Sequence, residues 1–198
     1  MQKSESIADK WNARYASLSN DIAPAQASMV LAEGLRWLPD AESSSEHAEQ
    51  PVNRRNALDL ACGRAGNAYL LAQCGFCVSA WDISGAAIDH ITQRRPATID
   101  HAVQRDVSQQ PPEPESFDVI VVSRFLDRSI CPAIALALKP GGVLFYQTFV
   151  HGLSNPDYLL APNELLTLFS GLHILEYHEP AEDNDGKAEA RLVARRPA

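Results

Sequence analysis

The sequence Asn56-Ala57-Leu58-Asp59-Leu60-Ala61-Cys62-Gly63-Arg64-Ala65-Gly66 has the form of a buried strand that runs through a turn into a helix. Residues 56–61 make a short apolar run, which is typical of a strand covered on both faces. Gly63 provides a turn without a Cβ, so a ligand can approach the backbone there. Gly66 opens the helix, where backbone N–H groups point outward. Such a glycine turn is shared by sheets that bind nucleosides and dinucleotides.

The same alternation of strands and helices continues along the chain. We expect further parallel strands at 76–81, 98–103, 117–122 and 143–149, and helices at 66–74, 84–94, 127–138 and 162–169. Two last strands, at 172–177 and 188–194, are predicted to pair antiparallel. The pattern predicts an α/β fold with a doubly wound, Rossmann-like sheet, mostly parallel with an antiparallel C-terminal strand. Ligands of such sheets bind at the carboxyl ends of the strands, so we consider the residues there.

The first 54 residues differ from the rest of the chain. Helical spacing relates Trp11, Tyr15 and Leu18, and a second helical segment ends before Pro39. Residues 40–54 contain almost no apolar side chains, which is typical of a mobile linker. We therefore predict an N-terminal helical lid and mobile linker over 1–54, and a ligand-binding α/β domain over 55–198.

Composition and charge restrict the possible partners. The 198 residues carry a formal charge of −8, with 17 basic and 25 acidic side chains. An acidic protein repels a phosphate backbone on average, so a small molecule or an ion is favoured over nucleic acid. The sequence has no apolar run long enough to span a membrane and no apolar core of a secretion signal near Met1. We expect a cytoplasmic protein without a membrane partner.

Four cysteines are present, and Cys74 and Cys77 form a C-x-x-C pair. Such a pair can be a redox centre or half of a zinc site. A structural zinc would need a second pair of ligands, which the sequence does not supply. We therefore predict that these cysteines are small buried apolar residues at a helix-to-strand corner, and that the protein has no metal site.

Polar residues follow the predicted strands. Asp82 ends the second strand, 19 residues after Gly63, where a carboxylate can accept hydrogen bonds from both hydroxyls of a ribose. It could also cap the helix that Ser84 begins. Asp106 follows the third strand and could accept from an adenine amine, or be a solvated loop residue. After the fourth strand, backbone carbonyls near Ser123 would face the charged end of the ligand. Phe125 could pack on the adenosine or in the core.

These positions belong to a longer series of motifs. In order, the chain carries Leu58-Asp59-Leu60-Ala61-Cys62-Gly63, Trp81-Asp82-Ile83-Ser84, Arg105-Asp106-Val107, Phe117-Asp118-Val119-Ile120 and Leu138-Lys139-Pro140-Gly141-Gly142. The series resembles that of class I S-adenosylmethionine-dependent methyltransferases over about residues 56–150. The Lys-Pro-Gly-Gly turn is the most telling motif, because dehydrogenases lack it at that place. The segment Trp11 to Tyr15, together with Ala61-Cys62-Gly63, is similar to the tellurite-resistance and thiopurine-type branch, whose members modify small soft nucleophiles.

The resemblance implies an enzyme that uses S-adenosylmethionine and releases S-adenosylhomocysteine. It also implies roles for the matching residues. Ala61 and Gly63 would line the methionine part, Asp59 would orient the loop or the amino group, and Asp82, next to Ile83, would hold the ribose. Asp106 and Val107 would contact adenine, Ser123 would offer its carbonyl to the amino group, Phe125 would pack nearby, and Arg14 would meet the carboxylate from the lid.

Two departures from the family pattern leave the catalytic residues undecided. Ala61 replaces the first glycine of the usual loop, and Asp127 stands near where related sequences often carry a histidine. A soft acceptor needs no base, whereas a hydroxyl or amine needs one. Weak candidates are His151, Asp127 and, as part of the acceptor pocket, Tyr158, although Asp127 is also a helix N-cap candidate. The run Asn155-Pro156-Asp157-Tyr158 resembles a signature of nucleobase methylation, but it follows the wrong strand, so we predict a turn.

Two other functions share part of this pattern. A nicotinamide-dependent oxidoreductase has the glycine turn and the ribose acid, but it favours an intact G-x-G-x-x-G, whose first glycine is missing here. A non-catalytic regulatory module that binds S-adenosylmethionine would keep the binding residues without a catalytic group. The sequence therefore favours methyl transfer to a small-molecule or ionic acceptor, with the regulatory module as the alternative.

Overall fold

The computed structural model describes residues 6–17, 25–41, 54–94, 99–180 and 186–198. Most of the predicted linker at 40–54, and Leu18 of the first predicted helix, lie outside these ranges. Within the described chain, seven strands form one sheet: β1 (Asn56–Leu60), β2 (Cys77–Asp82), β3 (His101–Gln104), β4 (Phe117–Ser123), β5 (Leu138–His151), β6 (His173–His178) and β7 (Ala188–Arg195). Their order in the sheet is β3-β2-β1-β4-β5-β7-β6.

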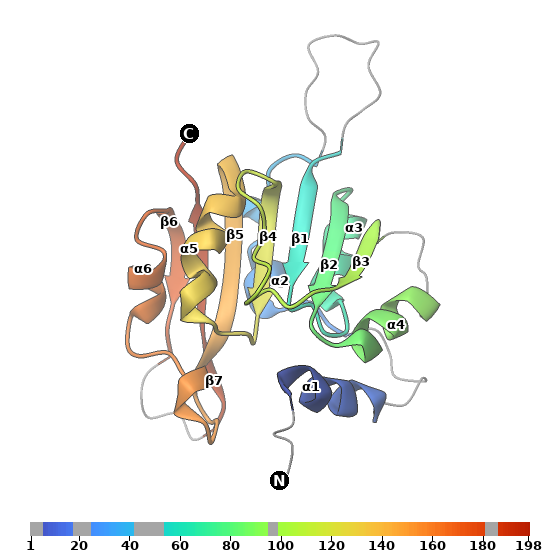
Figure 1. Ribbon diagram of the computed structural model, residues 1–198. Coiled ribbons are helices and arrows are strands. Elements are labelled where there is room, and N and C mark those ends of the chain that lie inside the picture. The colour runs from blue at the N-terminus through green and yellow to red at the C-terminus, as the bar shows by residue number, and fades with distance from the viewer. Residues whose placement is uncertain (1–5, 18–24, 42–53, 95–98, 181–185) are drawn as a thin grey trace, which may run out of the picture.

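The direction of the strands confirms the predicted fold class. The first five strands pair in parallel, whereas β7 is antiparallel to both β5 and β6. The chain order reverses between β1 and β4, which is the point at which doubly wound sheets bind their ligands. The carboxyl ends of the parallel strands point toward α1 (Figure 1).

Helices cover both faces of the sheet, and one of them lies across the carboxyl ends of the strands (Figure 1). They are α1 (Ile7–Ala16), α2 (Met29–Glu33), α3 (Gly66–Gln73), α4 (Gly85–Arg94), α5 (Cys131–Ala137) and α6 (Glu164–Leu168), with 3-10 turns η1 (Leu35–Trp37), η2 (Arg128–Ile130) and η3 (Pro156–Tyr158). α5 and α6 lie in front of the sheet in Figure 1, and α2 and α3 lie behind it.

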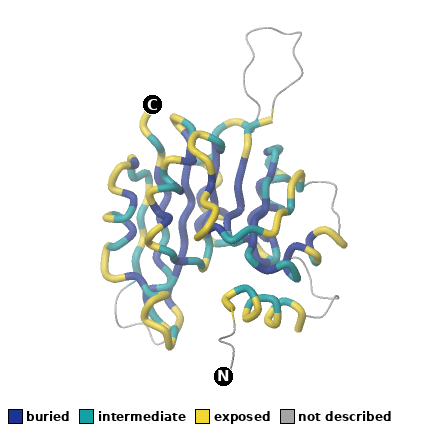
Figure 2. The backbone as a smooth tube through the Cα atoms, viewed as in Figure 1, coloured by how far each residue is buried: buried dark blue, intermediate teal, exposed yellow. Residues whose placement is uncertain are grey.

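Alternation along β1 divides the core between the two faces. Leu58 and Leu60 belong to the cluster that includes Ile134 of α5, whereas Ala57 belongs to the cluster that includes Leu71 of α3. The central strands are therefore buried on both sides (Figure 2). This explains why their sequences read as continuous apolar runs.

The boundaries differ from the predictions at two turns. The helix expected at 127–138 begins as the 3-10 turn η2 and becomes α-helical only at Cys131. β5 begins at Leu138 rather than at Val143, because the Lys-Pro-Gly-Gly turn is absorbed into the strand as an irregularity. The N–H of Gly141 donates to the carbonyl of Arg196 over 3.0 Å, so this turn is tied to the end of β7.

The described N-terminal segments are placed differently from one another. Val30 and Leu31 of α2 are core residues, and the Val30 N–H donates to Gln147 Oε1 of β5 over 2.8 Å. α1 has no buried residue and lies across the carboxyl ends of the strands. α2 therefore packs against the sheet as part of the core. Of the two described N-terminal helices, α1 is the one whose place over the strand ends suits the predicted lid.

No helix among the described residues is long and apolar enough to cross a membrane.

Candidate functional site

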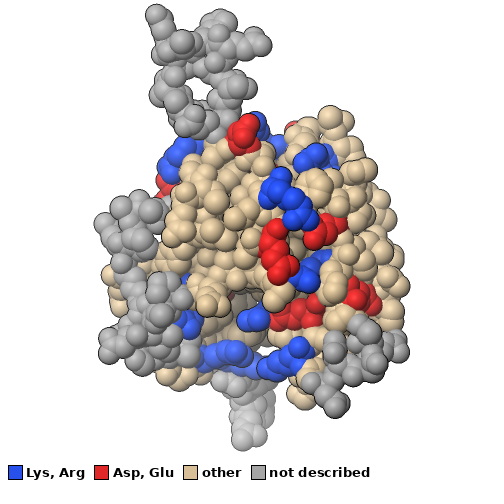
Figure 3. Space-filling view, turned by 180° about the vertical axis from the view of Figure 1, so that it is seen from behind, with Lys and Arg blue, Asp and Glu red and all other residues tan. Residues whose placement is uncertain are grey.

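A cleft of about 1970 Å³ opens at the carboxyl ends of the strands, between the strand-end loops and α1. Figure 3 shows a hollow on the rear face, with Lys and Arg side chains along its lower rim. Nine of the predicted cofactor-binding residues line the cleft: Arg14, Ala61, Gly63, Asp82, Ile83, Asp106, Val107, Ser123 and Phe125. Asp59, the tenth, does not.

Asp82 fixes the glycine loop at the end of β2. Its two carboxylate oxygens accept from the N–H groups of Gly63 and Ser84, each over 2.8 Å. Burial raises the pKa of this carboxyl, and these two bonds act against the rise. Because each oxygen can accept a second hydrogen bond, the side chain can still receive ribose hydroxyls. The cap of α4 is Ser84, whose Oγ accepts from the Ala87 N–H over 3.2 Å, whereas Asp82 holds the Ser84 N–H just before the helix.

Asp59 lies beneath the loop rather than in the cleft. It is fully buried, and it accepts from the Ala68 N–H over 3.0 Å and from Asn67 Nδ2 over 3.3 Å. Burial raises the pKa of Asp59 to about 7, despite these bonds. Of the two roles that the resemblance implies for it, the contacts fit orientation of the loop.

Asn67 connects three parts of the site, and sequence reasoning missed it. Its Oδ1 accepts from the N–H and the hydroxyl of Ser28, both over 2.8 Å, and its Nδ2 donates to Ser123 Oγ over 3.1 Å as well as to Asp59. It is a buried amide in the first turn of α3, whose other buried residues are Gly66, Ala68 and Leu71. That contrast was the available sequence signal, because buried polar groups need partners.

α1 closes the cleft over the glycine loop. Asn12 Oδ1 accepts from Ser84 Oγ over 2.9 Å and from the Ala86 N–H over 3.3 Å, so α1 is attached to the first turn of α4. Tyr15 lies above Gly63, and its ring stacks on Trp11 with centroids 5.9 Å apart. Burial, followed by the charge of Asp82, raises the pKa of Tyr15, so its hydroxyl stays protonated.

Arg14 points from the last turn of α1 toward the cleft, where it is solvent-exposed. Its guanidinium lies 5.2 Å from the centroid of the Trp11 ring. A cation held against an aromatic ring at the mouth of the cleft can reach a carboxylate inside it. The placement agrees with the predicted role, which stays a prediction.

The loops after β3 and β4 meet through serine and aspartate side chains. Asp106 accepts from the Ser108 N–H over 3.0 Å, and Asp127 accepts from Ser108 Oγ over 2.6 Å. Asp127 also accepts from the N–H and hydroxyl of Ser129, and thereby caps η2. Although burial opposes it, these bonds hold the pKa of Asp127 below its ordinary value. Asp127 is thus a cap that holds its charge, which makes it a weak base.

The other two candidate catalytic side chains are placed differently. His151 ends β5 and does not line the cleft. Tyr158 lines it from η3 and is 42% exposed. The run from Asn155 to Tyr158 forms the predicted turn, with Asn155 Oδ1 accepting from the Asp157 N–H over 3.0 Å. Tyr158 is therefore the better placed of the two to meet a ligand.

The cleft walls are more basic than the whole chain. They carry eight basic side chains, Lys10, Arg14, Arg64, Arg105, Arg124, Arg128, Lys187 and Arg191, and five acidic ones, Asp82, Asp106, Asp127, Asp157 and Glu189. Several of these charges neutralise each other or outer carboxylates, as in the Arg124 to Glu189 pair. This balance suits a ligand that carries a carboxylate.

Cys74 and Cys77, the C-x-x-C pair, do not line the cleft. Cys74 and Cys77 are free and partly buried, rather than buried as predicted, because the corner at Gly75 lies near the surface. Burial raises the pKa of both thiols, which disfavours reactive thiolates. Among the described residues, no group of three or more His, Cys, Asp or Glu side chains could hold a metal ion.

The geometry fits S-adenosylmethionine. Gly63 has a φ of +52° and faces the cleft without a Cβ, so its backbone can be approached closely. Asp82, 19 residues after Gly63, offers carboxylate oxygens that can accept from hydroxyls. Asp106 follows the end of the neighbouring strand β3. Ser123 ends β4 on the other side of the switch point and lines the cleft. Donors and acceptors thus follow the order of adenine, ribose and methionine.

Comparisons with known proteins support the same assignment. Residues 57–142 match the profile of the family described as a methyltransferase domain. A cypemycin N-terminal methyltransferase from a Streptomyces species is 32% identical over 107 residues, which are 50% of this chain and 43% of that protein. The chain therefore matches less than half the length of this relative.

Solved structures show the same fold. TehB from Haemophilus influenzae superposes with a TM-score of 0.62 at 22% identity, over 72% of this chain and 57% of that one. A SAM-dependent methyltransferase from Methanosarcina mazei superposes with a TM-score of 0.64 at 16% identity, over 87% and 99% of the chains. Together with the strand order and the glycine loop, the match of residues 57–142 to the methyltransferase-domain family indicates S-adenosylmethionine as the cofactor.

Proposed function

We propose that this chain transfers the methyl group of S-adenosylmethionine to a small-molecule or ionic acceptor with a soft nucleophilic atom. The observation that carries the proposal is the continuity of the cleft. One end has the nucleoside-binding pattern of Gly63, Asp82 and Asp106, and the other is lined by Phe149 and Tyr158. A second ligand at this other end would face the methionine part of the first.

Residues of the strand ends would hold the cofactor. The free lone pairs of Asp82 would accept from the ribose hydroxyls, with Ile83 beside them. Asp106 and Val107 would contact adenine, and the Ser123 carbonyl would accept from the amino group. Arg14 would pair with the carboxylate from α1. When bound, S-adenosylmethionine supplies a methyl group on a sulfonium, which is already a good leaving group.

The protein itself has to align the acceptor with the methyl group and to exclude water from the cleft. A soft nucleophile such as a thiol or an oxyanion of a heavy element needs little help from a base. This agrees with Asp127, which is engaged by Ser108 and Ser129, and with His151, which lies outside the cleft. α1 covers the loop at Gly63, and the turn at Tyr158 borders the opposite end. Together they would hold the acceptor in line with the methyl carbon.

A panel of acceptors tests the proposal. The protein is incubated with S-adenosylmethionine labelled in the methyl group and with dithiothreitol, tellurite, selenite or a short peptide with a free α-amine. Label in a thiol or oxyanion product, lost in Asp82→Ala, is the expected result. The peptide is included because the Streptomyces relative is an N-terminal methyltransferase. Label in the peptide alone would overturn the small-acceptor class, and no label despite tight cofactor binding would favour the regulatory module.

A further inference from the structure

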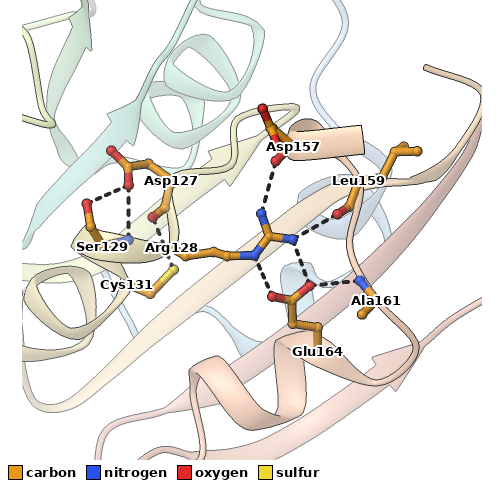
Figure 4. A network of polar contacts seen from close by, with 8 residues as sticks. All are labelled: Asp127, Arg128, Ser129, Cys131, Asp157, Leu159, Ala161 and Glu164. Atoms are coloured by element: carbon orange, nitrogen blue, oxygen red, sulfur yellow. Dashed lines mark hydrogen bonds and ion pairs between the residues drawn. The ribbon is translucent and has the colours of Figure 1, made fainter. Parts of the chain in front are cut away.

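Arg128 is the centre of a polar network at the acceptor end of the cleft (Figure 4). Its Nε and Nη2 donate to the two carboxylate oxygens of Glu164 over 2.5 and 2.9 Å. Its Nη1 donates to the carbonyl of Asp157 over 3.0 Å, and Nη2 also donates to the carbonyl of Leu159 over 2.8 Å. One side chain of η2 thus holds two carbonyls of a different loop and the first residue of α6.

That loop, residues 152–161, is named the acceptor loop here. It connects β5 to the segment before α6, and Leu153, Ser154, Asn155, Asp157 and Tyr158 line the cleft. Residues 154–158 are all exposed, so burial of apolar surface contributes little to their position. At its end, Leu160 is buried and donates through its N–H to the carbonyl of Phe149 over 2.9 Å.

Glu164 completes the anchor from the far side of the loop. Its Oε2 also accepts from the Ala161 N–H over 2.7 Å, so Arg128 and Glu164 hold the loop at three backbone groups. Hydrogen bonding to Arg128 lowers the pKa of Glu164, which keeps the carboxylate charged. Charge-assisted, two-point contacts of this kind fix direction as well as distance.

The neighbour of Arg128 in the sequence faces the cofactor end. Asp127 bonds to Ser108, which follows Asp106 on the loop after β3. Figure 4 shows Asp127 and Arg128 extending to opposite sides of η2. The strand-end loops of β3, β4 and β5 are therefore joined through two adjacent residues. The backbone of η2 sets the distance between the adenine side and the acceptor side.

We propose that Arg128 is a positioning residue for the acceptor: it holds the acceptor loop against the cleft and so sets the affinity for the acceptor but not for the cofactor. The inference rests on the proposed function, because only a methyl acceptor gives the loop this role. Arginine is needed rather than lysine. A single ammonium cannot present a planar fork to a carboxylate and two carbonyls at once.

The chain offers a matched control. Arg196 has the same kind of partners: it donates to Glu115 and to the carbonyls of Leu136 and Leu138. It does not line the cleft, and it lies beyond the end of β7, on the side of the sheet away from α1. Arg196→Ala therefore removes an equivalent network without touching the acceptor loop.

The test compares Arg128→Ala, Arg128→Lys and Arg196→Ala by hydrogen–deuterium exchange and by calorimetry with S-adenosylhomocysteine. In both Arg128 variants, amides of residues 152–161 should exchange faster by about tenfold or more, the scale of one hydrogen bond to a charged group. The dissociation constant of S-adenosylhomocysteine should stay within about twofold, since no cofactor contact is lost. Arg196→Ala should change neither quantity.

Kinetics give a second readout. With the panel compound that is methylated fastest, Arg128→Ala and Arg128→Lys should raise KM for the acceptor more than they lower kcat. Unchanged exchange in residues 152–161, or an equal loss of S-adenosylhomocysteine affinity, would overturn the inference. Should Arg128→Ala fail to fold, Glu164→Gln is used, and it should give the same pattern with a smaller change. Absence of any turnover in the wild type would contradict the proposed function. Whether Arg128 anchors the acceptor loop is tested independently, by hydrogen–deuterium exchange and S-adenosylhomocysteine binding.

Discussion

The Tyr15 hydroxyl oxygen lies 2.5 Å from the point where a Cβ on Gly63 would stand. Gly63 has a φ of +52°, a backbone conformation that other residues rarely adopt. Glycine is therefore required at position 63 for two reasons: the turn needs a positive φ, and Tyr15 of α1 leaves no room for a Cβ. The lack of a Cβ at Gly63 allows Tyr15 of α1, a helix without a buried residue, to lie close over the glycine loop.

This contact predicts how substitutions at the two positions combine. Gly63→Ala should lower stability and cofactor affinity, because the methyl group meets the Tyr15 hydroxyl and the left-handed φ costs about 1 kcal/mol. In the Tyr15→Phe background the hydroxyl is absent, and the nearest ring atom, Cζ, lies 3.3 Å from the added methyl group. Gly63→Ala should therefore lower stability and cofactor affinity less in the Tyr15→Phe background than in the wild type. Thermal unfolding and S-adenosylhomocysteine titration of all four proteins measure the coupling, and strict additivity would contradict the proposed contact.

Asn67 should be more important for stability than its place in a helix suggests. Asn67→Ala removes one of the two hydrogen bonds to the buried Asp59 and the acceptor of the partly buried Ser28 N–H and hydroxyl. We therefore expect a loss of about 1–3 kcal/mol in the free energy of unfolding. Asn56→Ala is the control, because that side chain donates a single bond to the carbonyl of Ser116 at an exposed site. Urea unfolding measures both. Equal, small losses would show that the Asn67 connections are not stabilising.

Asp59 makes stability depend on pH. Its pKa in the folded protein, about 7, lies above its ordinary value of 3.8, so between these values the folded state binds more protons than the unfolded state. Its contribution is therefore fully present below about pH 4 and is lost as the pH rises toward 7. In Asp59→Asn this dependence disappears, although the protein is less stable throughout.

Urea unfolding of wild type and Asp59→Asn from pH 4 to pH 7 checks this expectation. The difference in free energy between the two proteins should shrink as the pH rises. Groups with lowered pKa values, such as Glu164, change stability in the opposite sense at lower pH, but they cancel in the difference. Parallel curves for the two proteins would mean that Asp59 does not titrate in this range.

The sheet could be predicted from the sequence because its central strands are buried on both faces. The apolar run expected at 117–122 is β4, which ends one residue later at Ser123. Positions at the strand ends could also be predicted, because parallel strands all end at the same edge. That rule predicts Gly63, Asp82 and Asp106 at one edge of the sheet, and all three line the cleft.

Contacts that depend on distant partners could not be predicted. Arg128 meets Glu164, which is 36 residues away, and Asn67 meets Ser28, which is 39 residues away. Neither pair has a regular spacing on one helix or strand. The sequence indicates a turn at Lys-Pro-Gly-Gly, whereas its inclusion in β5 depends on the bond from Gly141 to Arg196. Local patterns fix elements, whereas these contacts depend on how the elements pack.

The measurement that tests the central claim most directly is calorimetric titration with S-adenosylhomocysteine, with NADH as the comparison ligand. The wild type should bind S-adenosylhomocysteine with a dissociation constant on the order of micromolar and should not bind NADH. Asp82→Ala should lose this binding, whereas Asp118→Asn should keep it, because Asp118 accepts from the Asn56 N–H at the other end of the sheet. Binding of NADH, or no binding of S-adenosylhomocysteine by the folded wild type, would contradict the assignment of the cofactor.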